Sequence, residues 1–398
     1  MNREQPGAPS RIPFHQPSIG QAERQAVLDV LDSGWLTTGE RVAEFEAAIQ
    51  RDLNVTHAVA VNSATSALHL ALEALGVGAA DEVVVPTYTF AASAEVVRYL
   101  GARPRLADVD PVTLNATAET IDAQLRQATK AIMVVHFGGL VADMEPILDL
   151  ARRRGIAVLE DAAHALPASR NGRAAGTFGE AGALSFYATK TVTTGEGGML
   201  LTSDARIADR ARVMRLHGIS RDAWNRYSAS GSWYYEIEDI GFKYNLTDIA
   251  ASIGIVQLAR AEEMRRERVA HRYGAALEAA GLGDLVDAPP LPGADDVHAW
   301  HLYPIRLRVD RLTIDRATVI EELKAKGIGT SVHFIPLHLH PYYRRTYGHK
   351  PADLPVATRE YEREISLPIY PALEDEAVER VVHALSGILK PTRVASGV

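Results

Sequence analysis

Short apolar segments alternate with helical patterns through the first half of the chain, and this alternation limits the fold more than any other feature. Runs dominated by Val, Ile, Leu and Ala, typical of strands buried on both faces, occupy residues 57–61, 82–86, 105–109, 131–137 and 156–160. Between them, apolar residues recur at helical spacing, as at 64–75, 91–100 and 144–154. Buried strands separated by helices indicate a mostly parallel sheet with helices on both faces, so we predict a three-layer α/β fold.

The alternating pattern ends near residue 250. Residues 249–268 have the pattern of one long helix, and a Gly- and Pro-rich stretch follows at 281–293. Beyond it the pattern predicts two strands and two helices, at 300–307, 330–334, 319–326 and 374–389. We therefore predict a large α/β domain at 1–250, which includes the N-terminal segment, and a smaller α+β domain at 251–398.

The composition narrows the classes of function. A formal net charge of −8 at pH 7 argues against nucleic-acid binding, and the absence of cysteine excludes disulfides and thiolate metal sites. No apolar run approaches the length of about 18 residues that a membrane span requires. Residues 1–11 are polar and lack the apolar core of a signal peptide, so we expect a cytoplasmic protein that does not bind membranes.

Lys190 is a candidate catalytic amine. Only 7 of the 42 basic residues are lysines, and Lys190 lies on a loop of hydroxyl residues and glycines between the apolar segments 184–187 and 199–201. An amine can lose its proton and attack a carbonyl carbon, whereas a guanidinium cannot. The alternative is that Lys190 is an ordinary lysine on a surface loop. The neighbouring segments distinguish between these two interpretations.

Two other loops that follow predicted strands offer groups for a phosphate and a planar ring. Ala64 and Thr65 lie at the start of a predicted helix, where free backbone N–H groups and the helix dipole favour an anion; a simple helix cap is the alternative. In the loop 86–90, Phe90 or Tyr88 could lie flat against a ring, although an aromatic residue at a strand end can also belong to the core.

A third loop carries an acidic pair, Glu160 and Asp161, directly after an apolar strand, with His164 close behind. A buried carboxylate requires a cationic partner, and a protonated pyridine nitrogen is one such partner. A metal site is the alternative, but neither a cysteine nor a second nearby histidine supports it. With Ser185 and Lys190 on the fourth loop, these groups match the phosphate, ring, nitrogen and aldehyde of pyridoxal 5′-phosphate (PLP), so we expect this cofactor and no metal.

The sequence resembles the nucleotide-sugar aminotransferases of the DegT/DnrJ type, which have the fold type I architecture of aspartate aminotransferase. The resemblance covers nearly the whole chain. It rests on matching motifs at residues 12–14, 33–39, 62–68, 86–90, 160–164, 185–190, 196–198, 241–248, 333–338, 354–355 and 366–368.

The resemblance implies a role for each cofactor-binding residue. Lys190 would hold the cofactor covalently and shuttle a proton, Asp161 would pair with the pyridine nitrogen, and His164 would contact the ring. Phe90 would stack on the ring, while the amides of Ala64 and Thr65 and the hydroxyl of Ser185 would hold the phosphate. In family dimers, the segment matching 241–248 reaches into the partner's active site. Because many members have Asn at the position of Lys243 and Arg at that of Asn245, either residue could contact the phosphate.

The resemblance also implies a substrate. Trp35, Thr37, His333 and His338 match segments that line the sugar-nucleotide site, although the histidines could instead pack the seam between domains. We expect a homodimer with shared active sites that moves an amino group from L-glutamate to a UDP-linked 4-keto sugar. Alternatives are a 3-keto sugar, a dTDP- or GDP-linked acceptor, and a non-catalytic PLP-binding regulator. A related class that removes a sugar hydroxyl has His at the lysine position, and Lys190 argues against it.

Overall fold

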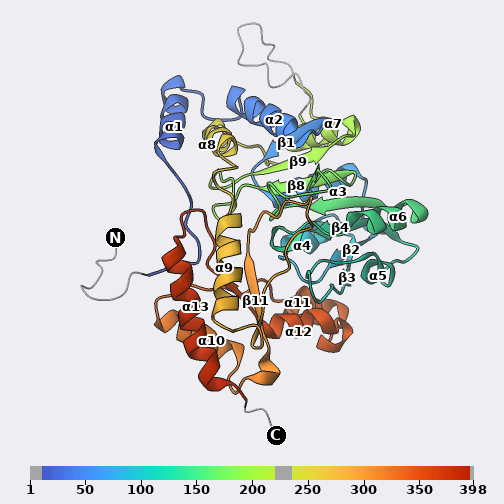
Figure 1. Ribbon diagram of the computed structural model, residues 1–398. Coiled ribbons are helices and arrows are strands. Elements are labelled where there is room, and N and C mark those ends of the chain that lie inside the picture. The colour runs from blue at the N-terminus through green and yellow to red at the C-terminus, as the bar shows by residue number, and fades with distance from the viewer. Residues whose placement is uncertain (1–10, 220–234, 395–398) are drawn as a thin grey trace.

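The computed structural model describes residues 11–219 and 235–394, and its largest element is a seven-stranded sheet (Figure 1). The strands are β1 His57–Val61, β2 Glu82–Pro86, β3 Arg103–Ala107, β4 Thr129–Val135, β5 Ala157–Asp161, β8 Ala181–Ser185 and β9 Gly198–Thr202, in the order β1-β9-β8-β5-β4-β2-β3. Within this sheet β9 runs antiparallel to the other six strands, which are parallel to one another. The expected mostly parallel sheet is confirmed.

Helices cover both faces of this sheet. Along β4, Ile132 and Val134 enter one apolar core while Ala131 and Met133 enter the other, as the two-residue period of a strand requires. The first core is closed by α2 Glu40–Leu53, α5 Ala118–Asp122, α6 Met144–Arg154 and α8 Asp248–Ala259, and the second by α3 Ala64–Ala74, α4 Ala92–Tyr99 and α7 Ala205–Met214. The three-layer α/β prediction is therefore confirmed.

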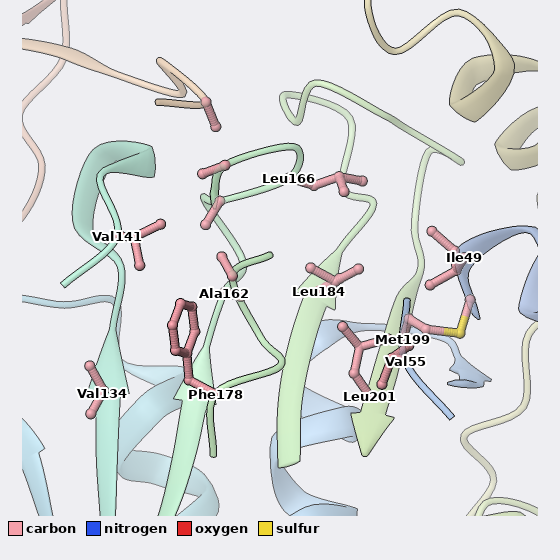
Figure 2. Packing of buried hydrophobic residues seen from close by; sticks show 14 of the residues in the cluster. Ile49, Val55, Val134, Val141, Ala162, Leu166, Phe178, Leu184, Met199 and Leu201 are labelled. Carbon is pink, nitrogen blue, oxygen red and sulfur yellow. The ribbon is translucent and has the colours of Figure 1, made fainter. Parts of the chain in front are cut away.

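The first core places α8 close to the loop of Lys190. Figure 2 shows part of this core, with Ile49 of α2 on the same side of the sheet as Met199 and Leu201 of β9. A Cβ atom at Gly254 of α8 would lie 2.6 Å from the Phe45 ring and 2.9 Å from Thr194 Cγ2. The close contact of α8 with α2 and with the loop therefore requires glycine at this position.

A second, antiparallel sheet has its own core. It contains β10 Val286–Asp287, β11 Tyr303–Leu307 and β12 Glu364–Leu367, packed with α9 Glu267–Ala279, α10 Arg316–Ala325 and α13 Asp375–Leu389. In Figure 1 these elements lie to the left of and below the large sheet. The remaining elements are α1 Gln21–Ser33, the hairpin of β6 Ser169–Arg170 and β7 Arg173–Ala174, α11 Pro341–Tyr347 and α12 Pro355–Arg363, together with short 3-10 turns.

Three sequence-based expectations were wrong in detail. The single helix expected at 249–268 is two helices, α8 and α9, separated by a turn that carries Arg266 into the interior. Residues 330–334 form only one bridge, from Ser331 to Ser366, because β12 is the strand that pairs with β11. The strand expected at 184–187 is β8, which ends at Ser185, so that Tyr187 lies in the following turn.

Candidate active site

The candidate residues gather around one cavity of about 510 Å³ at the carboxyl edge of the large sheet. Its walls come from the segments that follow β1, β2, β5 and β8, and from two segments of the second sheet that contain His301 and His333. Ligands in open α/β sheets bind at this edge. Of the residues expected from the sequence, the cavity is lined by Ala64, Thr65, Phe90, Asp161, His164, Ser185, Lys190 and His333.

A wider and more open hollow of about 1000 Å³ lies elsewhere, beside α9 and α12. None of the candidate residues lines it. In its wall the guanidinium groups of Arg308, Arg359 and Arg363 are paired with carboxylates, and that of Arg306 donates to the carbonyls of Pro111 and Val112. The smaller cavity is therefore the candidate active site, because the unusual chemical groups converge there.

Lys190 is held in the wall of the cavity by its backbone. Its amide donates a hydrogen bond to the Tyr187 carbonyl at 2.9 Å, and its Nζ faces His301 Nε2 at 3.4 Å. The surrounding protein shields the amine from water, and this desolvation lowers the pKa of Lys190 to about 7; Asp161 opposes the shift and Arg266 adds to it. An unprotonated amine is thus well populated near neutral pH, which suits a nucleophile and a proton acceptor.

The neighbouring acids Glu160 and Asp161 point in different directions and have different partners. Glu160 is fully buried against His136, with 2.8 Å between its Oε2 and Nε2 of the imidazole. Its carboxylate also accepts hydrogen bonds from the backbone N–H groups of Gly176, Phe178 and Gly179. Glu160 is thus a saturated structural group, so only the second acid of the pair is available to a ligand.

Asp161 lies at the end of β5 and faces the cavity. Ser93 Oγ donates to its Oδ2 at 2.7 Å, and the Ala163 amide donates to its Oδ1 at 3.2 Å. Thr89 Oγ1 lies 2.8 Å from Ser93 Oγ and continues this network. These contacts orient the carboxylate, and one side of it still faces the cavity, where a ligand can reach it.

The start of α3 presents the backbone groups expected there to the cavity. The Ser63 side chain caps the helix by accepting from the Ser66 amide at 3.1 Å, and the first-turn amides of Ala64 and Thr65 have no intrahelical acceptor. A Cβ atom at Gly198 would lie 2.3 Å from the Ser63 carbonyl carbon and 2.5 Å from the Ala64 nitrogen. Glycine at this position therefore lets β9 pass directly beneath the helix terminus.

An aromatic wall completes the cavity. The His164 ring centroid lies 4.3 Å from that of His301 and 5.7 Å from that of Phe334, while Phe90 is 63% exposed near Phe334. Burial and the nearby cations hold the pKa of His164 well below its usual value, so its ring is neutral. Within the described residues His164 Nδ1 is buried without a hydrogen-bond partner, which leaves it available to a ligand.

His333 is oriented by a buried chain of polar groups. Its Nδ1 lies 2.9 Å from Ser366 Oγ, which donates to Glu364 Oε1 at 2.5 Å, and its amide donates to Glu364 Oε2 at 2.9 Å. Burial raises the pKa of Glu364 to about 8 and lowers that of His333 to about 4. The cavity therefore presents a neutral, fixed imidazole at this point.

Four residues expected at the site do not line this cavity, although one of them, Asn245, pairs with Val61 at the end of β1. The Trp35 indole donates to the Thr38 carbonyl at 3.1 Å, and the Thr37 carbonyl accepts from the Asp248 amide at 3.1 Å. Asn245 Nδ2 donates to Thr38 Oγ1 at 2.7 Å, and Lys243 is exposed nearby in sequence. The segments 35–39 and 243–248 therefore form one unit, to which none of the cavity-lining residues belongs.

His338 also does not line the cavity. It is fully buried, with its Nδ1 2.8 Å from Thr87 Oγ1 and its Nε2 2.9 Å from Thr358 Oγ1. Both ring nitrogens of His338 are occupied by protein partners. Of the two roles considered from the sequence, packing between segments therefore fits His338, and contact with the substrate does not.

No sequence pattern singled out His301 or Arg266. Arg266 belongs to a charged stretch, Arg265 to Arg268, that reads as an exposed helix, yet it is 1% exposed. His301 is a polar residue next to Trp300 and before an apolar strand, which is the one local signal that it could have an unusual role.

Seven strands in this order, with a shielded lysine and a carboxylate at their carboxyl edge, define the fold type I class of PLP enzymes. The model of the DegT/DnrJ/EryC1/StrS aminotransferase family matches residues 17–386. The spore coat polysaccharide biosynthesis protein SpsC of Bacillus subtilis is 46% identical over 382 residues, covering 95% of this chain and 97% of SpsC. The chain therefore belongs to the DegT/DnrJ/EryC1/StrS aminotransferase family, as its motifs suggested.

Solved structures agree with this assignment. The aminotransferase TlmJ from Streptoalloteichus hindustanus has a TM-score of 0.86 at 38% identity, covering 94% of this chain and 98% of TlmJ. The PLP-form of the putative sugar aminotransferase Spr1654 from Streptococcus pneumoniae has a TM-score of 0.87 at 31% identity, covering 95% and 98%. Spr1654 has also been solved in apo- and PMP-forms. The cofactor of this family is PLP.

The residues present fit this cofactor. The amides of Ala64 and Thr65 with the Ser185 hydroxyl suit a phosphate, and Asp161 suits a protonated ring nitrogen. The unpartnered His164 Nδ1 needs a polar partner in this cavity, and Lys190 is positioned to react with an aldehyde. In the described parts of the chain, no three His, Asp or Glu side chains are arranged to hold a metal.

No helix within residues 11–219 and 235–394 is both long and apolar enough to cross a bilayer.

Proposed function

We propose that this aminotransferase moves an amino group from L-glutamate to the keto carbon of a nucleotide-linked sugar. The most specific form of the proposal is a UDP-linked 4-keto sugar as acceptor and a 4-amino sugar as product. The observation that supports a sugar acceptor is the wall formed by His333, Phe334 and Phe90 beside Lys190. A neutral imidazole and aromatic faces offer hydrogen bonds and an apolar platform to a sugar ring without imposing a charge.

The relatives support the same substrate class. SpsC is named for the biosynthesis of spore coat polysaccharide, and Spr1654 is described as a putative sugar aminotransferase. The nucleotide, the keto position and the donor are taken from the sequence motifs. A cytoplasmic location is also part of the proposal.

Each residue has a defined task in this proposal. When bound, PLP supplies an electron sink for the electron pair left behind when the donor loses its Cα proton. Lys190 Nζ takes up that proton and returns it, which its lowered pKa of about 7 allows near neutral pH. Asp161 holds a proton at the ring nitrogen, and the amides of Ala64 and Thr65 bind the phosphate. His333 orients the acceptor sugar.

A panel of acceptors tests the proposal. UDP-, dTDP- and GDP-linked 4-keto and 3-keto sugars are incubated with the enzyme and L-glutamate, and the amino sugars are identified by mass spectrometry. We expect the UDP-linked 4-keto sugar to have the highest kcat/KM. Preference for a 3-keto sugar would place the reacting carbon wrongly, and no turnover with any acceptor would favour a PLP-binding regulator.

We also propose a homodimer with shared active sites. Trp35, Thr37, Lys243 and Asn245 match family segments that line an active site, yet in one chain they lie together outside its cavity. A partner subunit would bring its copy of this unit to the mouth of the cavity. Phe90, with 63% of its surface exposed at that mouth, leaves room for such a contact.

Complementation between two inactive chains tests sharing. One chain carries Lys190→Ala, and the other carries Lys243→Ala with Asn245→Ala. Each heterodimer should contain one intact site and should have about half the activity of a wild-type dimer. No recovery in verified heterodimers would show that the segment serves its own chain, and the single variants Lys243→Ala and Asn245→Ala identify which residue contacts the phosphate.

A further inference from the structure

Arg266 is the most deeply buried cation near the cavity, and its partners are neutral. It is 1% exposed at the start of α9, its Nη2 donates to the Thr189 carbonyl at 2.9 Å, and its Nη1 donates to the His301 carbonyl at 3.0 Å. Its Nε is buried without a partner among the described residues. Burying a positive charge on neutral carbonyls is unfavourable, and desolvation lowers the pKa of Arg266 to about 10. Such an arrangement calls for a functional explanation.

The same guanidinium reaches Lys190 through His301. Arg266 Nη1 lies 3.5 Å from His301 Nδ1, and His301 Nε2 lies 3.4 Å from Lys190 Nζ. A guanidinium can only donate, so the imidazole nitrogen that faces it must carry the lone pair. A neutral imidazole then has its proton on the other nitrogen, which faces the lysine. Both contacts, of 3.5 Å and 3.4 Å, are attractive only when the His301 proton is on Nε2 and Nδ1 carries the lone pair.

We propose that Arg266 is a positioning residue that holds the Lys190 amine in its unprotonated form through His301. The His301 Nε2–H can donate only to an Nζ that offers a lone pair, and an ammonium offers none. Arg266 thereby acts twice, once by fixing the tautomer of His301 and once as a like charge that disfavours a second cation. The inference rests on Lys190 being the reactive amine of the family and not on the identity of the sugar.

The other groups around the amine agree with this assignment. The titratable groups that face Lys190 are Asp161, His164, His301, His333, His15 and Arg266, with Glu196 and Tyr187 also lining the cavity. Burial, assisted by Lys190 itself, lowers the pKa of each of the four histidines, so they contribute no positive charge at neutral pH. Burial is the main reason why the pKa of Lys190 is lowered to about 7; Asp161 favours the ammonium, and Arg266 opposes it with a smaller influence.

An arginine suits this place better than a lysine would. Its planar fork donates at once to a carbonyl in the Lys190 loop, at Thr189, and to a carbonyl next to β11, at His301. It therefore ties together the two segments whose relative position sets the distance between His301 and Lys190. The positive charge of Arg266 and its hydrogen bonds to the two segments therefore both act on the Lys190 amine.

Chemical labelling of full-length protein freed of cofactor tests the inference without any substrate. Acetic anhydride is applied over a range of pH, and acetylation of Lys190 is measured by peptide mass spectrometry against Lys324, whose side chain is 72% exposed. Wild-type Lys190 should titrate near pH 7. In Arg266→Gln the midpoint should rise by about one unit, which lowers labelling at pH 7 by about fivefold, because the unprotonated fraction falls from about one half to about one tenth.

Two variants serve as comparisons. Arg265→Gln removes the same charge one residue away, from a side chain paired with Glu262 and Glu267, and should leave the midpoint unchanged. In a His301→Phe background, the additional shift from Arg266→Gln should be clearly smaller than in wild type, because the contact that transmits it is gone. An unchanged midpoint in Arg266→Gln, or an equal shift in both backgrounds, would overturn the proposal.

The tautomer of His301 can be measured on the wild-type protein, which gives a test that does not require Arg266→Gln to fold. In ¹⁵N-histidine spectra, with the His301 signals assigned from the His301→Phe variant, we expect a neutral ring protonated at Nε2. A ring protonated at Nδ1, or at both nitrogens at pH 7.5, would contradict the relay. Neither measurement uses a sugar acceptor, so the outcome of the acceptor panel cannot be confused with this one.

Discussion

The two walls of the cavity are built in different ways. The inner wall consists of Ala64, Asp161 and Lys190, which follow strands of the large sheet and are held by backbone or helix-start hydrogen bonds. The outer wall consists of Phe90, His333 and Phe334, which come from connecting segments on both sides of the entrance. The inner groups are fixed by the sheet, whereas the outer groups can differ without altering it.

This difference assigns separate tasks to the two walls. Groups of the inner wall face the part of the reaction that every substrate shares, so changes there should impair both half-reactions. Groups of the outer wall face the acceptor, so changes there should alter KM for one substrate. The following predictions test this division, beginning with the largest expected effect.

Lys190→Ala should lower turnover by about 10⁴-fold or more, because both the reactive amine and the proton carrier are lost. In wild-type protein, borohydride reduction followed by peptide mapping should find the cofactor attached to Lys190. Attachment to another lysine would show that Lys190 is not the reactive amine, and the tasks assigned to the two walls would then be wrong.

Asp161→Asn should fold and bind the cofactor but lose about 2–5 kcal/mol of transition-state stabilisation, or about 30- to 5000-fold in kcat. The neighbouring Glu160→Gln is the matched control. It breaks the buried contact with His136 and should lower the melting temperature by several degrees, while the folded fraction keeps its half-reaction rates. Near-normal kcat in Asp161→Asn would show that the carboxylate has only a structural role.

His333→Ala should raise KM for the sugar nucleotide by about tenfold, the value of one or two hydrogen bonds, and leave the glutamate half-reaction nearly unchanged. His338→Ala is the control, since His338 bonds Thr87 and Thr358 outside the cavity. It should reduce stability without a selective change in KM. Equal loss in both half-reactions for His333→Ala would mean that the outer wall is not a separate acceptor surface.

Glu364→Gln should have the smallest effect on turnover, and it should change the pH dependence of stability. Because the pKa of Glu364 is raised to about 8, the folded protein binds more protons than the unfolded chain between about pH 4.5 and 8. This group's contribution to the free energy of unfolding is therefore full at low pH and is lost as pH rises through 8. The variant lacks this loss, so the difference in stability between variant and wild type should shift in favour of the variant by about 4 kcal/mol between pH 5 and pH 9, which a series of melting temperatures measures. A difference independent of pH would show that the Glu364 carboxyl is not the titrating group behind His333.

Much of the inner wall could be predicted because its signals are local. Asp161 directly follows an apolar run, Ala64 and Thr65 begin a helix after a strand, and Lys190 lies on a glycine-rich loop. Each of these positions is set by a strand end, and strand ends can be read from hydrophobic patterns within one or two residues. The sheet then brings them to one edge, as parallel pairing requires.

The outer wall and its support depended on contacts between distant residues. His333 and His338 look alike in sequence, yet only His333 faces the cavity, because the His338 ring nitrogens are taken by Thr87 and Thr358. Arg266 looks like part of an exposed charged helix, and the break between α8 and α9 turns it inward.

Local sequence patterns are sufficient to predict the three-layer sheet, the strand-end loops and the residue types that a PLP aminotransferase needs, because hydrophobic period and turn residues act over short distances. Which of the acids and histidines enter the cavity, and which bond protein partners instead, depends on contacts between distant segments. The same kind of contact places Arg266 and His301 behind Lys190. The physical reason is that burial and hydrogen bonding of a polar group depend on partners as far apart as 251 residues along the chain, as for Thr87 and His338, and no local pattern records them.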